Sequence, residues 1–293
     1  MDGTTNFLHG LPVYSVSIAL EEKNETQSEM NQHYDELHNM SYEPEVLMEA
    51  TERASGMLDA KYEKADIPAE VEQNSHLSEG EKKALRDLLF RFEHLFDGTL
   101  GDWQTDPVNL ELKTDAKPYH AKAFPVPHIY EQSLKTEVQR LCDLGVIEKI
   151  NESEWAAPTF IIPKKNGTPR FVSDFRVLNS HLKRKPFPIP PIQDLLQKLD
   201  GFTHATSLDL NMGYYTIKLT PGASNLCTIV LPWGKYCYKR LPMGVAGSPD
   251  IFQEKMTSLM AGLEFVRTYL DDLLIITKES FEDHFKKLEV AFE

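Results

Sequence analysis

The stretch Arg267-Thr268-Tyr269-Leu270-Asp271-Asp272-Leu273-Leu274-Ile275-Ile276-Thr277 places two adjacent carboxylates inside an apolar, β-branched run. Leu273 to Ile276 has the composition of a buried strand, and Val266 to Tyr269 that of its hairpin partner, with Leu270 and Asp271 near the bend. Asp disfavours sheets, and an unpaired buried charge costs free energy. The pair therefore indicates either an exposed hairpin tip or a site for a divalent cation, because carboxylate oxygens suit Mg²⁺.

A third carboxylate strengthens the second explanation. Asp209 lies in another strand-like apolar segment, Ala205 to Leu210. Three carboxylates in one place repel one another unless cations neutralise them, so bound metal is expected. The order of strands and helices around them predicts an α+β layer, in which the two acidic strands face each other and helices back one side. Two Mg²⁺ ions there would suit in-line displacement, one activating a 3′-hydroxyl and the other holding a triphosphate.

Charge is distributed unevenly along the 293 residues, which allow one large domain or two small ones. The net charge of −14 by itself argues against a nucleic-acid partner. Residues 1–115 carry 25 acidic and 9 basic residues, whereas residues 116–293 carry 20 and 22, and 149–185 carry 3 and 8. The second part is thus electrostatically different and contains a basic patch.

Cysteine and apolar patterns exclude other classes of protein. The three cysteines form no CxxC pair, so neither a disulfide framework nor a zinc site is indicated. No run of 18 apolar residues is present, so no membrane span is expected.

A basic hairpin is predicted over residues 157–176, where two strands flank an Asn166-Gly167 tip. Lys164, Lys165 and Arg170 surround the tip. This is either a solvated basic hairpin or a clamp on a polyphosphate, which Arg binds in bidentate fashion and Lys as a point charge.

Local patterns predict further elements. Ser78 and Glu81 form a capping box that opens a helix ending near Gly98 and packing on the following domain. Ser248 is expected to cap the helix that follows the Leu241–Gly244 loop, with Pro249 at its first position. Other helices are expected near 43–60, 134–145, 192–201 and 281–292, an extended chain over 106–128, and strands at 13–20, 146–150, 216–219 and 228–238.

The first 22 residues, which begin MDGTTNFLHGLP and continue into a VSIAL strand, resemble a metal-site motif of the inositol monophosphatase family. Asp2 would match a metal-binding Asp, and Gly3 and Thr4 the phosphate-contacting turn. The family's other ligands have no counterpart, and one carboxylate cannot hold the ions such a site needs. We therefore expect a grafted or misjoined fragment without phosphatase activity.

Residues 106–293 resemble the fingers and palm of a reverse transcriptase, most closely the gypsy-type LTR retrotransposon family. Four stretches in the family's order carry the resemblance: LGVIEKINESEWAAPTFIIPKKNGTPRFVSDFRVLN, SLDLNMGYY, RLPMGVAGSPDIFQ and YLDD. It implies an RNA-directed DNA polymerase of a retrotransposon polyprotein, with a palm sheet that is antiparallel and backed by helices. It also implies two Mg²⁺ ions or Mn²⁺, an RNA or DNA template with its primer, dNTPs, and other Pol parts as partners, in an intracellular, cytoplasmic particle.

The resemblance also assigns roles to residues. Asp209, Asp271 and Asp272 would be the catalytic metal ligands, together with the Leu210 carbonyl. Tyr214 would be the steric gate against a ribose 2′-OH, and Lys165 and Arg170 would hold the triphosphate. Gln253 and Met243 would lie near the template and the nascent pair, although Met243 and Pro169 stand where relatives usually carry other residues.

Three regions are expected: an inositol-monophosphatase-like fragment at 1–22, an acidic spacer with one or two helices at 23–105, and fingers and palm at 106–293. The family's thumb, connection and RNase H domain have no counterpart in the printed sequence. We therefore expect weak or no activity from this chain alone. The alternative is a catalytically inactive retroelement relic that retains nucleic-acid binding.

Overall fold

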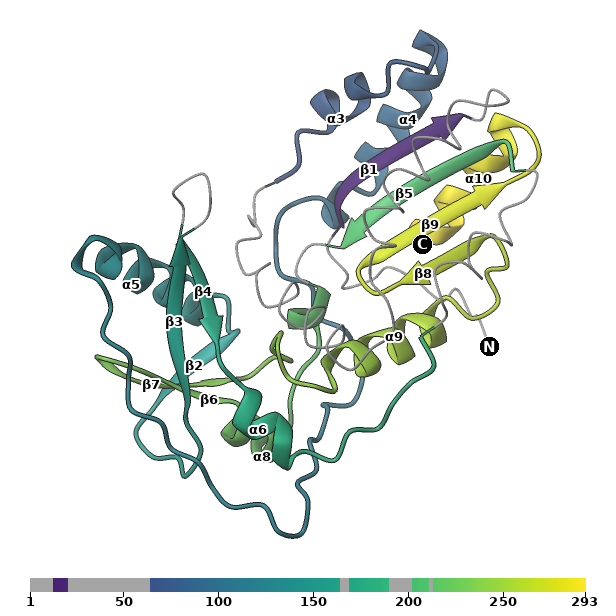
Figure 1. Cartoon of the computed structure of the whole chain (residues 1–293). Helices are drawn as coiled ribbons and strands as arrows, with labels where there is room; N and C mark the ends of the chain where they lie inside the picture. Colours follow the sequence, from purple (N-terminus) through teal and green to yellow (C-terminus); the bar gives the residue numbers. More distant parts are fainter. Residues whose placement is uncertain (1–12, 21–63, 164–168, 190–201, 211–212) are drawn as a thin grey trace.

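The computed structural model describes residues 13–20, 64–163, 169–189, 202–210 and 213–293, with only the backbone described for 13–20, Ile129, 162–163 and 169–171 (Figure 1). The helices predicted near 43–60 and 192–201 and the tip at 164–168 lie outside these residues. The described elements form two sheets, each with its own helices (Figure 1). None of the described helices is long and apolar enough to cross a membrane.

The sheet that contains the predicted acidic residues has four antiparallel strands in the order β1-β5-β9-β8. The hairpin predicted from the acidic stretch is confirmed as β8 and β9, and the Asp209 strand as β5. In the register, Asp209 faces Asp272 directly. The strands are β1 (Val13–Leu20), β5 (His204–Leu210), β8 (Val266–Tyr269) and β9 (Asp272–Thr277).

Helices cover one face of this sheet (Figure 1). The final helix α10 (Phe281–Phe292) begins at the Ser280 cap and packs on β5 and β9. The Phe292 ring contacts those of Phe92 and Phe96 at centroid distances of 5.4 and 5.9 Å. The helix predicted from the capping box therefore packs on the rest of the chain as expected. The helices of this region are α3 (Ile67–Gln73) and α4 (Glu79–Arg91).

The second sheet is mixed, with the order β2-β7-β6-β3-β4. Its only parallel contact among the described strands joins β3 to β6. Helix α5 (His128–Asp143) packs against it at β2 and β4, and α8 (Pro221–Leu226) at β7. The strands are β2 (Ile147–Ile150), β3 (Ala157–Pro163), β4 (Pro169–Ser173), β6 (Thr228–Leu231) and β7 (Gly234–Tyr238). The short helix α6 (Arg176–His181) follows β4.

Three local predictions were wrong. Helix α4 ends at Arg91 and a 3-10 turn follows it, because the chain bends to bury Leu95 and Phe96. The predicted strand at 216–219 is absent; a 3-10 turn at Gly213–Thr216 precedes an isolated bridge from Lys218 to Arg240. Helix α9 (Ser248–Leu259) has Gly247 as its N-cap, because the Ser248 hydroxyl instead donates to the Pro242 carbonyl at 2.7 Å.

Two histidines are buried between α10 and the acidic sheet. His284 lies 2.7 Å from the Thr206 hydroxyl through Nε2 and 3.0 Å from the Thr277 hydroxyl through Nδ1. Its ring stacks on that of His204 at a centroid distance of 5.6 Å. Burial, reinforced by the nearby His204, lowers the pKa of His284 to about 4, and burial lowers the pKa of His204 as well. Burial therefore favours the neutral form of both rings.

This arrangement predicts that folding stability falls with acidification. The unfolded chain protonates His284 near its ordinary pKa of 6.5, whereas the folded chain resists protonation down to about 4. The stabilisation is complete above the unfolded pKa and is lost as pH falls toward the folded one. Between about pH 7.5 and 5, wild type should lose about 2 kcal/mol more unfolding free energy than His284→Gln, measured by urea denaturation. Equal losses would show that His284 titrates normally.

Candidate active site

The β8–β9 hairpin presents the two adjacent acids beside β5. Asp272 begins β9 and is exposed, whereas Asp271 lies in the bend and is half-buried. Asp209, also half-buried, comes one residue before the end of β5. The Leu210 backbone N–H donates to the Asp271 carbonyl at 3.0 Å, which holds the bend against the end of β5. The fold thus brings Asp209 next to Asp271 and Asp272, an adjacent pair that lies far from it in the sequence.

The carboxylate of Asp271 is largely removed from water and lies close to two other negative charges. Its Oδ1 is shielded from solvent and has no hydrogen-bond partner among the described residues. Burial, followed by the negative charges of Asp209 and Asp272, raises its pKa to about 8. Burial alone raises the pKa of Asp209. A carboxylate oxygen in such a position is costly unless a cation or a donor reaches it.

The side chain of Gln253 in α9 forms hydrogen bonds to the bend that carries Asp271. The residue is 1% exposed, and its Oε1 accepts from the Leu270 backbone N–H at 2.7 Å. Its Nε2 donates to the carbonyl and the hydroxyl of Thr268, at 3.3 and 3.1 Å. Leu270 has a φ of 50°, the one positive φ among the described non-glycine residues. These bonds hold in place a backbone conformation that L-residues rarely adopt.

A cluster of packed aromatic rings lies next to the acids. Tyr214 is 2% exposed, and its ring lies 4.9 Å from that of Phe252 in α9, measured between centroids. Trp103 contacts the same Phe252 ring edge-on at 5.9 Å. Burial, followed by the Asp271 charge, raises the pKa of Tyr214 well above its usual range. Tyr214 is therefore a neutral ring fixed next to the acids.

Gly213 is required by this packing, and its substitution gives a testable prediction. A Cβ at this position would lie 2.7 Å from Phe252 Cζ and 3.4 Å from Asp271 Oδ1. Because Phe252 is held between two rings, Gly213→Ala should lower the unfolding free energy by about 1–3 kcal/mol, measured by urea denaturation. Gly222→Ala in α8 is the matched control: its Cβ would meet nothing within 4 Å, and it should be neutral or stabilising by up to about 1 kcal/mol. Equal effects of the two changes would contradict the packing argument.

The other predicted site residues are placed differently. Lys165 lies outside the described residues, and Arg170 is described only as backbone within β4. Met243 is buried in the loop before α9. Gln253 uses its amide on the bend, a role that was not predicted.

Sequence reasoning also missed two supports from the region preceding residue 106. Asp102 accepts from Lys218 Nζ at 2.7 Å and from Arg240 at 2.9 Å. The Trp103 N–H donates to the Thr216 carbonyl at 3.1 Å. These contacts hold the end of the Gly213–Thr216 turn and the chain that follows it. No local pattern indicates them, because they join segments more than 110 residues apart.

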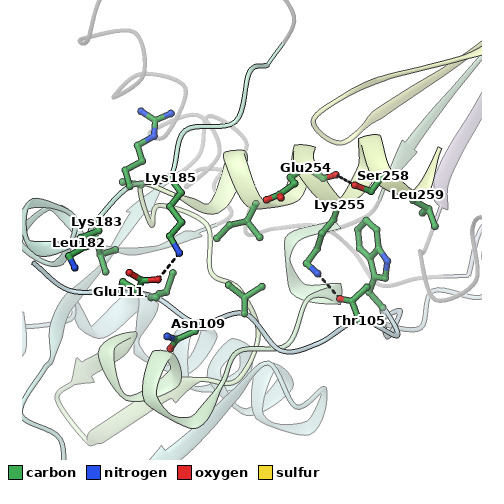
Figure 2. Close-up of a pocket in the computed structure, with 17 residues that line it drawn as sticks. Thr105, Asn109, Glu111, Leu182, Lys183, Lys185, Glu254, Lys255, Ser258 and Leu259 are labelled. Carbon is green, nitrogen blue, oxygen red and sulfur yellow. Dashed lines mark hydrogen bonds and ion pairs between the residues drawn. The ribbon is translucent and has the colours of Figure 1, made fainter. Parts of the chain in front are cut away.

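A groove of about 690 Å³ is lined in part by α9 (Figure 2). The α9 residues in its lining include Lys255 and Leu259, but neither Phe252 nor Gln253. Lys185 pairs with Glu111 on one wall, and Lys255 donates to the Thr105 hydroxyl on the other (Figure 2). Apolar side chains, including Ile251, also line it.

Within the described ranges, no set of three His, Cys, Asp or Glu side chains is gathered closely enough to form a metal cage. The three acids nevertheless fit a hard divalent cation, because they supply oxygen donors and one of these, Asp271 Oδ1, is buried without a partner. A cation would also relieve the repulsion that raises the Asp271 pKa.

Comparisons with known proteins agree with this geometry. Residues 162–293 match the family model described as reverse transcriptase (RNA-dependent DNA polymerase). Two Drosophila melanogaster proteins, the retrovirus-related Pol polyproteins from transposons 412 and 297, are 31% and 27% identical over 57% and 74% of this chain. The chain spans only 14% and 21% of their lengths.

A solved structure supports the same fold. The foamy viral protease-reverse transcriptase in complex with RNA/DNA hybrid has a TM-score of 0.69 and 21% identity, over 78% of this chain and 31% of that one. The architecture is accordingly that of reverse transcriptase fingers and palm, with the acidic sheet as the palm. The chain therefore contains a reverse transcriptase domain related to those of retroelement polyproteins.

Proposed function

We propose that this chain catalyses RNA-directed DNA synthesis, the transfer of a deoxynucleotide from a dNTP to a primer 3′-OH on an RNA or DNA template. The observation that carries the proposal is the convergence of Asp209, Asp271 and Asp272 at the end of the palm sheet, where one oxygen of Asp271 is buried and has no hydrogen-bond partner in the described part of the chain. The foamy viral relative, described as a complex with RNA/DNA hybrid, supports the choice of template.

Some of these residues would bind the metal ions, and another positions the bend. Asp209, Asp271 and Asp272, with the Leu210 carbonyl, would hold two Mg²⁺ ions, or Mn²⁺ in their place. Such ions, when bound, activate a hydroxyl nucleophile and neutralise triphosphate charge. Gln253 keeps the bend that carries Asp271 in its strained conformation.

The nucleotide would be selected and held by other side chains. Tyr214 presents a rigid ring beside Asp271, which suits exclusion of a ribose 2′-OH. Lys165 and Arg170 of the basic hairpin would bind the triphosphate. Met243 would lie near the nascent pair. We also place the chain in the gypsy-type branch of LTR elements, on the four sequence stretches that carry that resemblance.

Primer extension by the full chain on poly(rA)/oligo(dT) tests the proposal. Single-nucleotide incorporation with enzyme in excess detects the chemistry without requiring processive synthesis. Mg²⁺-dependent incorporation of dTTP is the expected result. Strongly salt-dependent binding of the hybrid without any incorporation would instead identify a relic.

The proposed steric gate gives a separate prediction. Tyr214→Ala should raise incorporation of UTP relative to dTTP by about 10–100-fold, because the ring that contacts the 2′-OH is removed. Tyr214→Phe keeps the ring and should retain the wild-type ratio. An unchanged ratio in the Ala variant would assign sugar selection to another residue.

A further inference from the structure

Trp103 precedes the family-matched residues 162–293, yet its side chain is buried against the residues around the acids. Its indole meets the Phe252 ring edge-on, at an interplanar angle of 85°, and Phe252 in turn packs on Tyr214, with the two ring planes only 31° apart. The three residues are 6%, 0% and 2% exposed. They therefore form one continuous row of buried rings that ends at the proposed steric gate.

The Phe252 ring has little freedom to move within this row. A Cβ added to Gly213 would lie 2.7 Å from Phe252 Cζ, so the Gly213 backbone already approaches the ring closely. Tyr214 and Trp103 contact the same ring. Because protein interiors are close-packed, a ring confined in this way responds when one neighbour is lost. A smaller side chain at position 103 leaves a cavity into which Phe252 can turn, away from Tyr214.

The main chain at Trp103 is bonded to the same turn that carries Tyr214. The Trp103 N–H donates to the Thr216 carbonyl at 3.1 Å, and Arg240 Nη1 donates to that carbonyl at 3.2 Å. Arg240 also donates to the neighbouring Asp102 carboxylate at 2.9 Å. The indole is thus fixed relative to the turn through its backbone as well as through its ring contact.

We propose that Trp103 is a positioning residue for Tyr214: acting through Phe252, it holds the Tyr214 ring in the orientation that excludes a ribose 2′-OH. In this role Trp103 needs no contact with the nucleotide. The consequence for sugar selection rests on the proposed function, whereas the support of the Tyr214 ring does not. The chain before residue 106 then contributes to the specificity of the reaction as well as to folding.

Two measurements on the full chain test this inference, and one of them requires no catalysis. Trp103→Leu keeps an apolar side chain but removes the ring, so the Tyr214 ring should flip at least about tenfold faster, measured by NMR on protein with labelled tyrosines. The Tyr214 signal is assigned by its loss in Tyr214→Phe. Trp103→Leu should also raise incorporation of UTP relative to dTTP by about 3–10-fold. Trp103→Phe, which restores a ring, should bring both values back toward wild type.

Trp155→Leu is the matched control, because Trp155 is also 6% exposed but its indole packs on the His181 ring, at a centroid distance of 5.8 Å. This change should leave the Tyr214 flip rate and the UTP-to-dTTP ratio unaltered, even where it lowers stability as much. Added to Tyr214→Ala, Trp103→Leu should not raise the ratio further, because both changes act through one ring. Trp103→Met takes the place of Trp103→Leu where the latter does not fold.

An unchanged Tyr214 flip rate in the folded Trp103 variant would overturn the inference. It would equally be overturned by an unchanged UTP-to-dTTP ratio, by a further rise of that ratio in the double variant, or by equal effects of Trp155→Leu. Absence of any incorporation by wild type would instead contradict the proposed function. The flip rate would still decide whether Trp103 holds the Tyr214 ring in place.

Discussion

Asp271→Asn is expected to abolish nucleotide incorporation while making the cation-free chain more stable. The Oδ1 of Asp271 is buried and unpartnered among the described residues, and the charges of Asp209 and Asp272 lie nearby. Removing one of three crowded charges should raise the unfolding free energy in EDTA by about 1–3 kcal/mol. Losing a ligand of the charge-stabilising ions should lower incorporation by at least about 1,000-fold, which corresponds to several kcal/mol.

Two measurements separate these effects. Urea denaturation in EDTA reports the stability, and single-nucleotide extension reports the chemistry. Asp115→Asn, a change at an exposed aspartate in a turn outside the palm sheet, is the control and should alter neither. Retained incorporation would show that the acid site is not catalytic. Unchanged stability would show that its carboxylates do not repel one another.

Asp250→Ala is expected to be the most destabilising single change away from the acids. Asp250 is 1% exposed and accepts from Arg184 Nε at 2.7 Å, from Arg184 Nη2 at 3.1 Å and from the Phe187 N–H at 3.1 Å. It also lies in the first turn of α9, where a negative charge suits the helix dipole. Removing it leaves a guanidinium and an N–H without their acceptor, which should cost about 3–5 kcal/mol.

The neighbouring ion pair supplies the control. Glu111 pairs with Lys185 on the wall of the groove, and both residues are exposed (Figure 2). Glu111→Ala should therefore change the unfolding free energy by less than about 1 kcal/mol. Urea denaturation of both variants checks the contrast. Similar losses would mean that burial does not decide the strength of these pairs.

The parts of the fold that could be predicted are those with a local signal. The β-branched run around Asp271 and the separate Asp209 strand indicated both strands and their facing carboxylates, and the register confirms this. The Asn166-Gly167 hairpin, the strands within 228–238 and the final helix were predicted from turn chemistry and periodicity. The strands on either side of the hairpin tip, the strands within 228–238 and the helix are confirmed.

The parts that could not be predicted depend on distant contacts. Gln253 stabilises the Leu270 bend across 17 residues, and Asp102 binds Lys218 across 116. The 216–219 segment has strand propensity, but burial of Tyr214 and Tyr215 favours a 3-10 turn before it. Serine is a favoured N-cap residue, yet the Ser248 hydroxyl donates to the Pro242 carbonyl in the preceding loop. The strand at 13–20 was predicted, but nothing in the sequence identified β5 as its neighbour.

The pairing of β1 with β5 has a consequence for how the chain folds. Its register joins residues more than 180 positions apart, whereas β8 and β9 are joined by a tight hairpin. Closing so long a loop is slow, and contacts of high sequence separation form late in folding. During synthesis, the segment 13–20 leaves the ribosome long before its partner exists. We expect the palm sheet to grow outward from the hairpin through β9 and β5, and to close at β1 in its final step.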